Sequence, residues 1–449
     1  MRHELMLERR VATVCRSEVV AAFSYALDLT EGQPQGLSIR ACYIAGELAR
    51  EIGLSGDDWA TVYYATLLKD LGCSSNAARI HELYRADDLA FKNRWKTVAP
   101  GLKSTLEFVF ENTARGAPLR ARVKAIAHIL RNGEAIAQEM IETRCTRGAD
   151  IARELRFGED VAQGIYHLDE RWDGSGRPGH LRGDAIPLAS RCALLAQIAD
   201  VFHTAAGPIA ACTEVALRSG TWLDPELCRS FARLAGTPRF WARLESASLE
   251  MQVAAMAPDL EEEVDEDYLD AITAAFGKVV DAKSPYTAGH SQRVAAYSEQ
   301  LGQRLGVLPG RLRRLKRAAT LHDVGKLGVS SAILEKPGKL DDAEWEVMRS
   351  HAVHTQAILG RIGAFADLAP IAAAHHERLD GFGYPLGLDE QTISHETRII
   401  TLCDFYDALS AERPYREAMA PAEALAIMER EVGTAIDPRG FEALREIVA

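Results

Sequence analysis

The stretch HDVGK spans His322 to Lys326 of this chain. It belongs to a set of five histidines and two carboxylates between residues 290 and 404: His290, His322, Asp323, His351, His375, His376 and Asp404. Buried histidines and carboxylates are costly without partners. Imidazole and carboxylate together suit iron, manganese, nickel or zinc, and the set contains no thiolate. The sequence therefore predicts a site for two metal ions.

The stretches around this set read as helices, and alternating strand patterns are scarce. Apolar residues from His290 to Leu305 recur at helical spacing, and a second helix is expected to end near His322. Asp341 and Glu344 form the pattern of a capping box that opens a helix through about residue 362. Further helices are expected from about residue 365 to 378 and from about 396 to 411. These patterns predict an all-α fold.

An internal repeat runs through the chain. GLSIR at Gly36 parallels GHSQR at Gly289, and LLKDLG at Leu67 parallels TLHDVG at Thr320, both with an offset of 253 residues. DERWDGSGRP at Asp169 parallels HERLDGFGYP with an offset of 207, and RCALLAQIAD parallels a stretch ending at Asp404 with an offset of 204. The chain therefore reads as two copies of one helical unit.

The first copy loses most of the ligand set. His290 falls on Leu37, His322 on Lys69, His351 on Arg144, and the pair His375-His376 on Leu168 and Asp169. Asp70 and Asp200 are interpreted as the remaining counterparts of Asp323 and Asp404. Leucine cannot ligate a metal and lysine or arginine would repel one, so the first copy is predicted to be metal-free.

The boundary between the copies is expected at the acidic stretch Pro258 to Asp267. This stretch reads either as a linker or as the capped start of a connecting helix, because acidic residues favour helix N-termini. We predict a degenerate regulatory or dimerisation domain at 1–255, an acidic linker or helix at 256–268, and a catalytic domain at 269–449.

The spacing within the ligand set indicates phosphoryl chemistry. Adjacent side chains on a helix point about 100° apart, so Asp323 can bridge towards a second ion while His322 holds the first. Two ions about 3.5–4 Å apart can clamp both oxygens of an in-line displacement at phosphorus. Lys326, four residues after His322, is expected on the same helix face, where it can steady the phosphate or protonate the leaving alkoxide. Asp404 and Asp407 are expected to share a helix face.

From about Tyr286 onward the sequence resembles the HD-GYP domain, a branch of the HD phosphohydrolases. The matching stretches, in order, are GHSQRV, HDVGK, ILEKPGKL, HHERLDGFGYP, DFYDALSAERPYR and the closing IDP. The resemblance implies two tandem all-α HD-type bundles, the first degenerate and ending in GRP instead of GYP. It also implies a phosphodiesterase for cyclic di-GMP or a related cyclic dinucleotide.

The same resemblance implies roles for individual residues. The seven residues of the set would be metal ligands, with Asp323 and Lys326 catalytic. Lys326, Tyr384, Pro385, Arg413 and Arg416 would contact the substrate, although the two arginines can instead be plain surface cations. Asp407 is expected either to contact the substrate or to support a metal ligand from behind, and otherwise to be a cap or a solvated residue. Tyr286 stands where three-metal members carry a glutamate, which favours two divalent ions; iron or manganese is expected, with nickel, zinc or magnesium as alternatives.

Composition limits the partners. The formal net charge of −12 argues against nucleic-acid polymers and anionic membranes. Eight scattered cysteines and a charged N-terminus without an apolar segment indicate a reduced, cytoplasmic protein. A homodimer is expected, because dimers are the commonest closed assembly, and a diguanylate cyclase is a candidate partner at the GYP loop.

The predicted function is therefore hydrolysis of a cyclic dinucleotide, cyclic di-GMP first, to the linear dinucleotide or mononucleotides. One alternative is a phosphohydrolase for cyclic GMP-AMP or another nucleotide, because ligands set the reaction while pocket walls set the base. The other is a sensor or scaffold that binds cyclic dinucleotide with little turnover.

Overall fold

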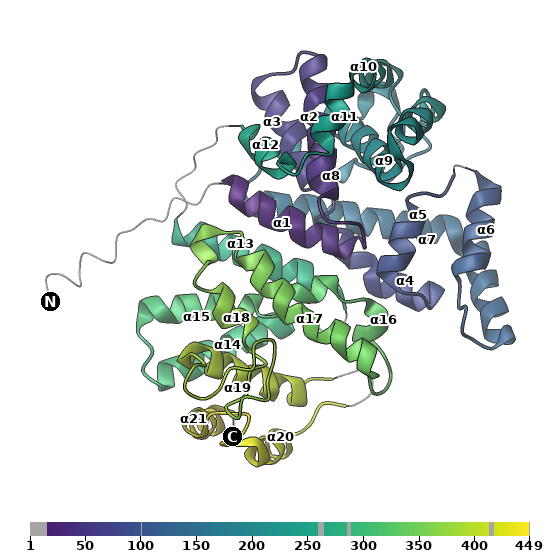
Figure 1. Cartoon of the computed structure of the whole chain (residues 1–449). Helices are drawn as coiled ribbons and strands as arrows, with labels where there is room; N and C mark the ends of the chain where they lie inside the picture. The colour runs from purple at the N-terminus through teal and green to yellow at the C-terminus, as the bar shows by residue number, and fades with distance from the viewer. Residues whose placement is uncertain (1–15, 100, 259–264, 285–288, 413–416, 449) are drawn as a thin grey trace, which may run out of the picture. The chain divides into compact units, whose positions relative to one another are not determined.

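A computed structural model of the chain describes residues 16–99, 101–258, 265–284, 289–412 and 417–448. Helices make up the regular structure of these residues (Figure 1), and three isolated bridges are their only β pairing. The all-α prediction is confirmed. Tyr286, Arg413 and Arg416 lie outside the described residues.

The chain divides into two compact units. One unit contains residues 23–259 and 330–332, and the other contains residues 260–329 and 333–449 together with residues 1–22. Helix α12 ends at Ala255 and helix α13 begins at Glu266, capped by the Asp265 side chain on the Tyr268 amide. At least this part of the acidic stretch is a capped helix start. The domain boundaries at 255 and 269 stay predictions.

The unit around residues 23–259 is built on helices that bury apolar faces such as Tyr43, Ile44 and Leu48 of α2. Helix α1 (Arg16–Thr30) is divided between the two units at residue 22. The further elements are α2 (Leu37–Glu51), α3 (Gly56–Leu67), η2 (Cys73–Asn76), α4 (Ala77–Tyr84), α5 (Asp88–Trp95), α6 (Leu102–Asn112), α7 (Leu119–Glu154), α8 (Glu159–Tyr166), η3 (Gly183–Ala185), α9 (Leu188–Arg218), α10 (Pro225–Ala235), α11 (Pro238–Leu244) and α12 (Leu249–Ala255).

The other unit is a second helical bundle, in which α14 packs against α15 and α19. Its elements are α13 (Glu266–Asp281), α14 (His290–Arg304), α15 (Pro309–Leu321), η4 (Val324–Gly328), α16 (Ser331–Leu334), α17 (Asp342–Leu359), η5 (Gly363–Phe365), α18 (Ala369–Ala373), α19 (His395–Ser410), α20 (Pro421–Met428), η6 (Glu429–Glu431) and α21 (Pro438–Val448). Two residues of α16 are assigned to the first unit.

Most of the helix predictions are confirmed. Helix α15 ends at Leu321, α19 covers His395–Ser410, and the capping box of Asp341 and Glu344 is formed at the start of α17. The helix predicted from about 365 to 378 is wrong in extent. Only Ala369–Ala373 is α-helical there, and turns carry the chain to the double histidine.

Both units repeat the same hydrogen bonds at the predicted offsets. Asp28 accepts from the Gly36 amide and the Ser38 hydroxyl, as Asp281 does from Gly289 and Ser291. Glu170 accepts from two loop amides, Gly179 and Leu181, as Glu377 does from Leu386 and Leu388. These matched contacts support the duplication.

One offset needs correction. Arg40 pairs with Asp200 at 2.6 Å, and its counterpart Arg293 pairs with Asp407 at the same distance. Helices α9 and α19 also begin 207 residues apart, not 204. Asp200 is therefore the counterpart of Asp407, and Asp404 falls on Gln197. The first copy keeps fewer acidic ligand positions than the sequence indicated.

Helix α9 is the described helix that is long and apolar enough, by length and composition, to cross a membrane. Half of that apolar window is buried inside the protein, and the helix is kinked at Ala206 and Gly207. Its burial and its match to α19 are typical of a core helix.

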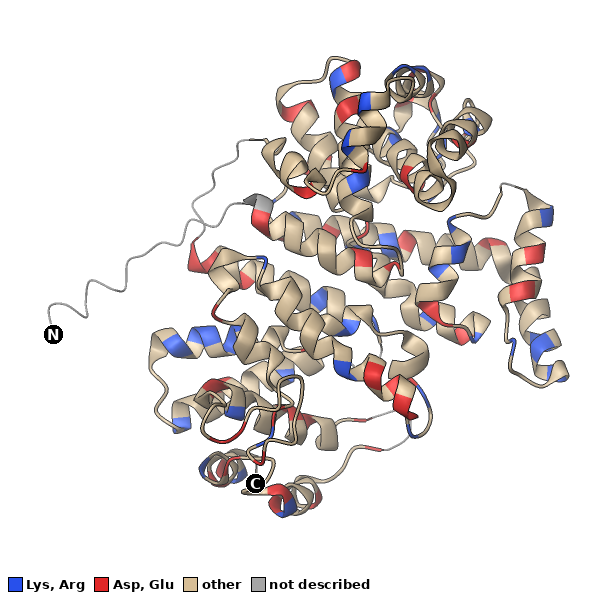
Figure 2. Ribbon diagram, viewed as in Figure 1, with Lys and Arg blue, Asp and Glu red and all other residues tan. Residues whose placement is uncertain are grey.

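Charged side chains of both signs are interspersed over the helices (Figure 2). The most basic element is α15, and its cations have carboxylate partners. Arg311 pairs with Glu396, Arg314 with Asp367, Lys316 with Glu299, and Arg313 and Arg317 with Asp270. This basic helix is neutralised within its own unit.

Candidate metal centre

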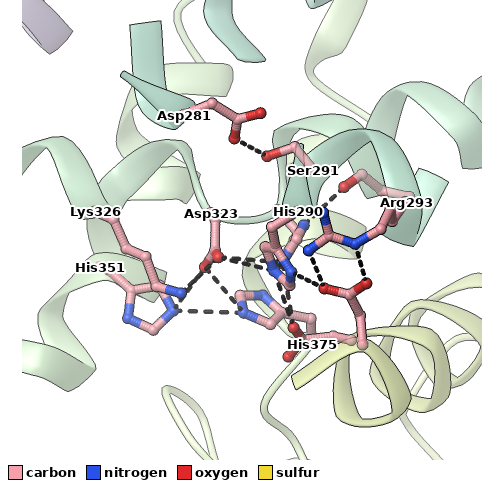
Figure 3. A network of polar contacts seen from close by, with 12 residues as sticks. Asp281, His290, Ser291, Arg293, Asp323, Lys326, His351 and His375 are labelled. Carbon is pink, nitrogen blue, oxygen red and sulfur yellow. Dashed lines mark hydrogen bonds and ion pairs between the residues drawn. The ribbon is translucent and has the colours of Figure 1, made fainter. Parts of the chain in front are cut away.

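The predicted ligand set is brought together from five places in the second copy. His290 is the first residue of α14, His322 and Asp323 follow the last residue of α15, and Asp404 lies within α19. His351 lies within α17, and the pair His375-His376 follows α18. Figure 3 shows Asp323 between His290 on one side and His351 on the other.

Asp323 faces two groups of ligand atoms with its two oxygens. Its Oδ2 lies 3.4 Å from His290 Nε2 and 3.3 Å from His322 Nε2. Its Oδ1 lies 3.7 Å from Nε2 of both His351 and His375. Asp323 thus stands between two clusters of imidazole nitrogens, which is the position of a bridging carboxylate.

Three triads in this centre have ligand atoms within 4.8 Å of one another. They are His290 with His322 and Asp404, His322 with Asp323 and His375, and His351 with His375 and His376. The Oδ1 atom of Asp323 is buried and accepts no hydrogen bond from the described residues. A buried carboxylate oxygen without a donor is costly, so a cation fits this position.

The histidines are oriented by bonds on their other ring nitrogen. Nδ1 of His322 lies 2.7 Å from the Ala319 carbonyl, Nδ1 of His351 2.5 Å from Met348, and Nδ1 of His375 2.7 Å from Ala372. A carbonyl accepts only, so Nδ1 carries the proton and the Nε2 lone pair faces the centre. Metal-ligating histidines almost always have such a partner.

Burial and charge set the protonation of the centre. Burial lowers the pKa of His351 to about 4 and that of His376 to about 3, so both imidazoles are neutral at pH 7. Burial opposes protonation of His290 too, but hydrogen bonds to Asp323, Asp404 and Asp407 raise its pKa to about 10. The carboxylates around His290 thus attract positive charge, which a metal ion would also satisfy.

Lys326 lies beside Asp323 and not on a helix face shared with His322. Helix α15 ends at Leu321, and the chain continues as the 3₁₀ turn Val324–Gly328, so the shared α-helical face predicted from the sequence is wrong. The turn places Lys326 Nζ 2.5 Å from Asp323 Oδ2. Burial would raise the pKa of Asp323, but Lys326 and His322 hold it well below its usual range.

Asp407, predicted as a substrate contact, is buried and fully engaged within the protein. Its Oδ2 lies 2.7 Å from His290 Nδ1, and Arg293 donates to both of its oxygens at 2.6 and 3.0 Å. Asp407 therefore orients His290 and does not face a substrate. Sequence reasoning missed Arg293, although the GHSQR repeat contained it.

The turn of the HDVGK stretch packs directly on α17. A Cβ on Gly325 would lie 1.9 Å from the His351 carbonyl oxygen, so only glycine fits there. Thr355 of α17 accepts from the Gly325 amide and donates to the His322 carbonyl. The same approach recurs in the first copy, where a Cβ on Gly72 would lie 1.9 Å from the Arg144 carbonyl oxygen.

The GYP loop borders the centre. The Tyr384 ring centroid lies 4.8 Å from that of His376 and 6.2 Å from that of His351. Tyr384 and Pro385 are both half-buried, and Glu377 holds the loop through two backbone amides. Tyr384 therefore lies beside two histidines of the centre, and Pro385 follows it in the same loop; their contact with a substrate stays a prediction.

The equivalent region of the first copy is filled by side-chain cations. The buried Lys69 pairs with Asp70, and Arg144 pairs with Asp169. Glu31, Asp70 and Cys73 lie close enough to hold an ion, but Lys92 and Lys96 both reach Glu31. Burial also raises the pKa of Cys73, so the thiol stays protonated. In the first copy, ammonium and guanidinium groups therefore neutralise the carboxylates in place of a metal ion.

Comparison with known proteins gives the family. The HD domain model matches residues 124–227 and 275–440, which is more than half of the chain and includes parts of both copies. The chain therefore belongs to the HD domain family.

Three similar proteins bear on the activity. A Vibrio cholerae protein named 3'3'-cGAMP-specific phosphodiesterase 3 is 51% identical over 96% of this chain and 94% of its own length. A crystal structure of a cyclic GMP-AMP specific phosphodiesterase of V. cholerae matches with a TM-score of 0.66, 44% identity and 96% coverage of both chains. The cyclic di-GMP phosphodiesterase response regulator RpfG of Xanthomonas campestris is 34% identical over 44% of this chain and 51% of its own.

Proposed function

We propose that this chain is a metal-dependent cyclic-dinucleotide phosphodiesterase whose preferred substrate is 3′3′-cyclic GMP-AMP. The seven-residue centre carries the reaction class. The substrate preference rests on the relative that matches 96% of this chain, which is named for 3'3'-cGAMP. Relatives named for cyclic di-GMP match only 39–44% of it. Cyclic di-GMP, which the sequence favoured, becomes the second candidate.

Two divalent ions fit the arrangement, with iron or manganese as the first candidates. His290, His322 and Asp404 would hold one ion and His351, His375 and His376 the other, with Asp323 between them. Such ions supply Lewis-acid activation of the phosphate and of the attacking water. The ligand roles are supported by the Nε2 atoms that face inward and by the carbonyl bonds on Nδ1.

The chain's own residues supply the remaining steps. Water attacks phosphorus in line and loses a proton to solvent as its oxygen bonds to phosphorus, the bond from phosphorus to one ribose 3′ oxygen breaks, and that oxygen takes a proton. Lys326 is the group we assign to this proton, because its ammonium lies at the edge of the centre and borders Asp323. The product is the linear dinucleotide, and a second cleavage would yield mononucleotides.

One experiment separates the candidates. The purified full chain, supplied with manganese or iron, is incubated with 3′3′-cyclic GMP-AMP and with cyclic di-GMP, and the products are separated by chromatography. We expect linear products from both, with the larger kcat/KM for cyclic GMP-AMP. A larger kcat/KM for cyclic di-GMP would reverse the preference, and binding of both without products would favour a sensor.

The first copy is proposed as a metal-free regulatory or dimerisation module. Its centre keeps Asp70 but surrounds it with cations, and its helices keep the packing of the bundle. The homodimer, the cyclase partner and the cytoplasmic location stay predictions. Light scattering of the full chain tests the dimer.

A further inference from the structure

A row of side chains leads from the metal centre of the second copy towards solvent. His376 is half-buried, and the half-buried Tyr384 ring lies beside it. The guanidinium carbon of Arg349 lies 5.6 Å from the Tyr384 ring centroid and 5.8 Å from that of Trp345. Trp345 is 44% exposed, and Arg349 is exposed as well. A ligand with phosphate at the centre would meet this row next.

Arg349 differs from most of the neighbouring cations because its guanidinium forms no ion pair with a carboxylate of the described residues. The cations of α15 are paired with carboxylates, and Lys336 near the start of α17 pairs with Glu344. No carboxylate of the described residues forms an ion pair with Arg349. Its described neighbours are the two aromatic rings, which hold the guanidinium over their faces.

The first copy provides an internal control for this row. At the offset of 207, Trp345 falls on Gln138, Arg349 on Glu142 and Tyr384 on Arg177. Gln138 donates to the Pro178 carbonyl and Arg177 pairs with Glu134, so two of these positions hold the loop there. Contacts that the fold needs, such as Arg40 with Asp200 and Arg293 with Asp407, recur in both copies. The first copy lacks both this row and the predicted metal ligands. We take this joint absence as support for a role of the row in substrate binding.

We infer that Arg349 is the guanine-recognising residue of the substrate pocket, held in position by Trp345 and Tyr384. This inference rests on the proposed function. Guanine presents two acceptors, O6 and N7, that match the paired donors of a guanidinium, whereas adenine presents one acceptor and one donor on the same edge. Lysine has the charge but not the planar pair of donors.

A phosphate would also attract Arg349, but the surroundings favour a base. The guanidinium lies near the exposed Trp345 ring, which offers a flat surface for stacking, and base–aromatic stacking stabilises a bound nucleobase. A guanine contact is also consistent with relatives named for two substrates, cyclic GMP-AMP and cyclic di-GMP, because each contains at least one guanine.

The test combines one protein variant with one substrate analogue in a thermodynamic cycle of four assays. All four use the full metal-loaded chain. Wild type and Arg349→Lys are each assayed with 3′3′-cyclic GMP-AMP and with an analogue carrying 7-deazaguanine, which lacks the N7 acceptor. We expect Arg349→Lys to lower kcat/KM for the natural substrate by about tenfold or more. Wild type should lose a similar factor on the analogue, and the variant should lose little further. Metal content should not change.

Arg439→Lys is the matched control, because Arg439 is an exposed arginine on α21 without an ion pair to the described residues. It should behave as wild type on both substrates. Equal losses by Arg349→Lys on natural substrate and analogue would assign Arg349 to a phosphate and overturn the inference while keeping the proposed function. Unchanged kcat/KM in Arg349→Lys would also overturn it. Absence of turnover of either cyclic dinucleotide by wild type would overturn the proposed function and the inference with it.

Discussion

Asp323 in the second copy and Asp70 in the first occupy equivalent positions, and each forms an ion pair with a lysine. The lysines come from different places. Lys326 follows Asp323 by three residues and leaves His322 free as a ligand, whereas Lys69 stands at the position of His322 itself. In both copies a buried carboxylate requires positive charge nearby, because an unpaired buried charge is strongly destabilising. The fold therefore accepts either a metal centre or side-chain cations at this place.

The framework around the two centres differs far less. The cap by Asp28 or Asp281, the loop anchor at Glu170 or Glu377, and the close packing of Gly72 or Gly325 recur in both. The predicted ligands, Lys326 and the row of Trp345, Arg349 and Tyr384 change together. A contact that recurs in both copies therefore belongs to the shared framework, and it can have a further role in one of them.

The largest expected contrast is between Asp323→Ala and Asp70→Asn in the full chain. Asp323→Ala removes the carboxylate that stands between the two ligand groups, so turnover should fall by about 10³-fold or more, as for loss of an essential catalytic group. Asp70→Asn leaves an acceptor for Lys69 and should keep turnover near wild type. Product chromatography and metal analysis check both; His375→Ala should behave as Asp323→Ala. Loss of metal in Asp70→Asn would show that the first copy also binds an ion.

Lys326→Ala is expected to have the next largest effect. A positioned proton donor contributes about 10²–10⁴-fold, so kcat should fall by that factor while metal content stays close to two ions per chain. Cys73→Ala is the matched control, because Cys73 stands at the equivalent position of the first copy, and its kcat should not change. Unchanged turnover in Lys326→Ala would make this lysine a structural partner of Asp323 only.

Asp407→Asn and Asp200→Asn test whether a recurring contact has gained a second role. Both aspartates pair with an arginine, but only Asp407 also bonds a ligand histidine. Outer partners of metal ligands are worth about 10–100-fold in affinity, so Asp407→Asn should weaken metal binding by that amount. Asp200→Asn should lower only the free energy of unfolding. Titration calorimetry and denaturant unfolding distinguish them, and equal metal affinity in both variants would contradict the positioning role.

The sequence revealed the ligand set, the double copy and the helical class because these depend on residue identity and on local periodicity. His290 and Asp404 lie far apart in the chain, yet the resemblance to the HD-GYP domain placed them in one set. The sequence left the role of Asp407 open because its partners, His290 and Arg293, approach it only through the packing of α14 on α19. The place of Lys326 depended on where α15 ends, and helix ends are set by hydrogen bonds that periodicity does not report. Arg349 carried no signal beyond being a charged residue on a helix, and only its ring contacts make it notable.

Metal removal should give the smallest of the expected differences between the two copies, and it needs no substitution. In the second copy, two ions bridged by Asp323 would together tie α14, α15, α17 and α19 through their ligands, so adding metal should slow amide exchange around residues 320–326, 349–353 and 402–406. In the first copy, Lys69, Arg144 and Lys96 already neutralise the carboxylates, so residues 67–73 and 142–146 should exchange at the same rate with and without metal. Hydrogen exchange of the full chain, read by mass spectrometry before and after chelation, measures both at once. Ligands that bind only the native state stabilise it by RT ln(1 + [L]/Kd), so the protection should rise with the concentration of free metal. Metal-dependent protection of residues 67–73 would mean that the first copy senses the metal of the second or binds its own, and its independence from metal would be wrong.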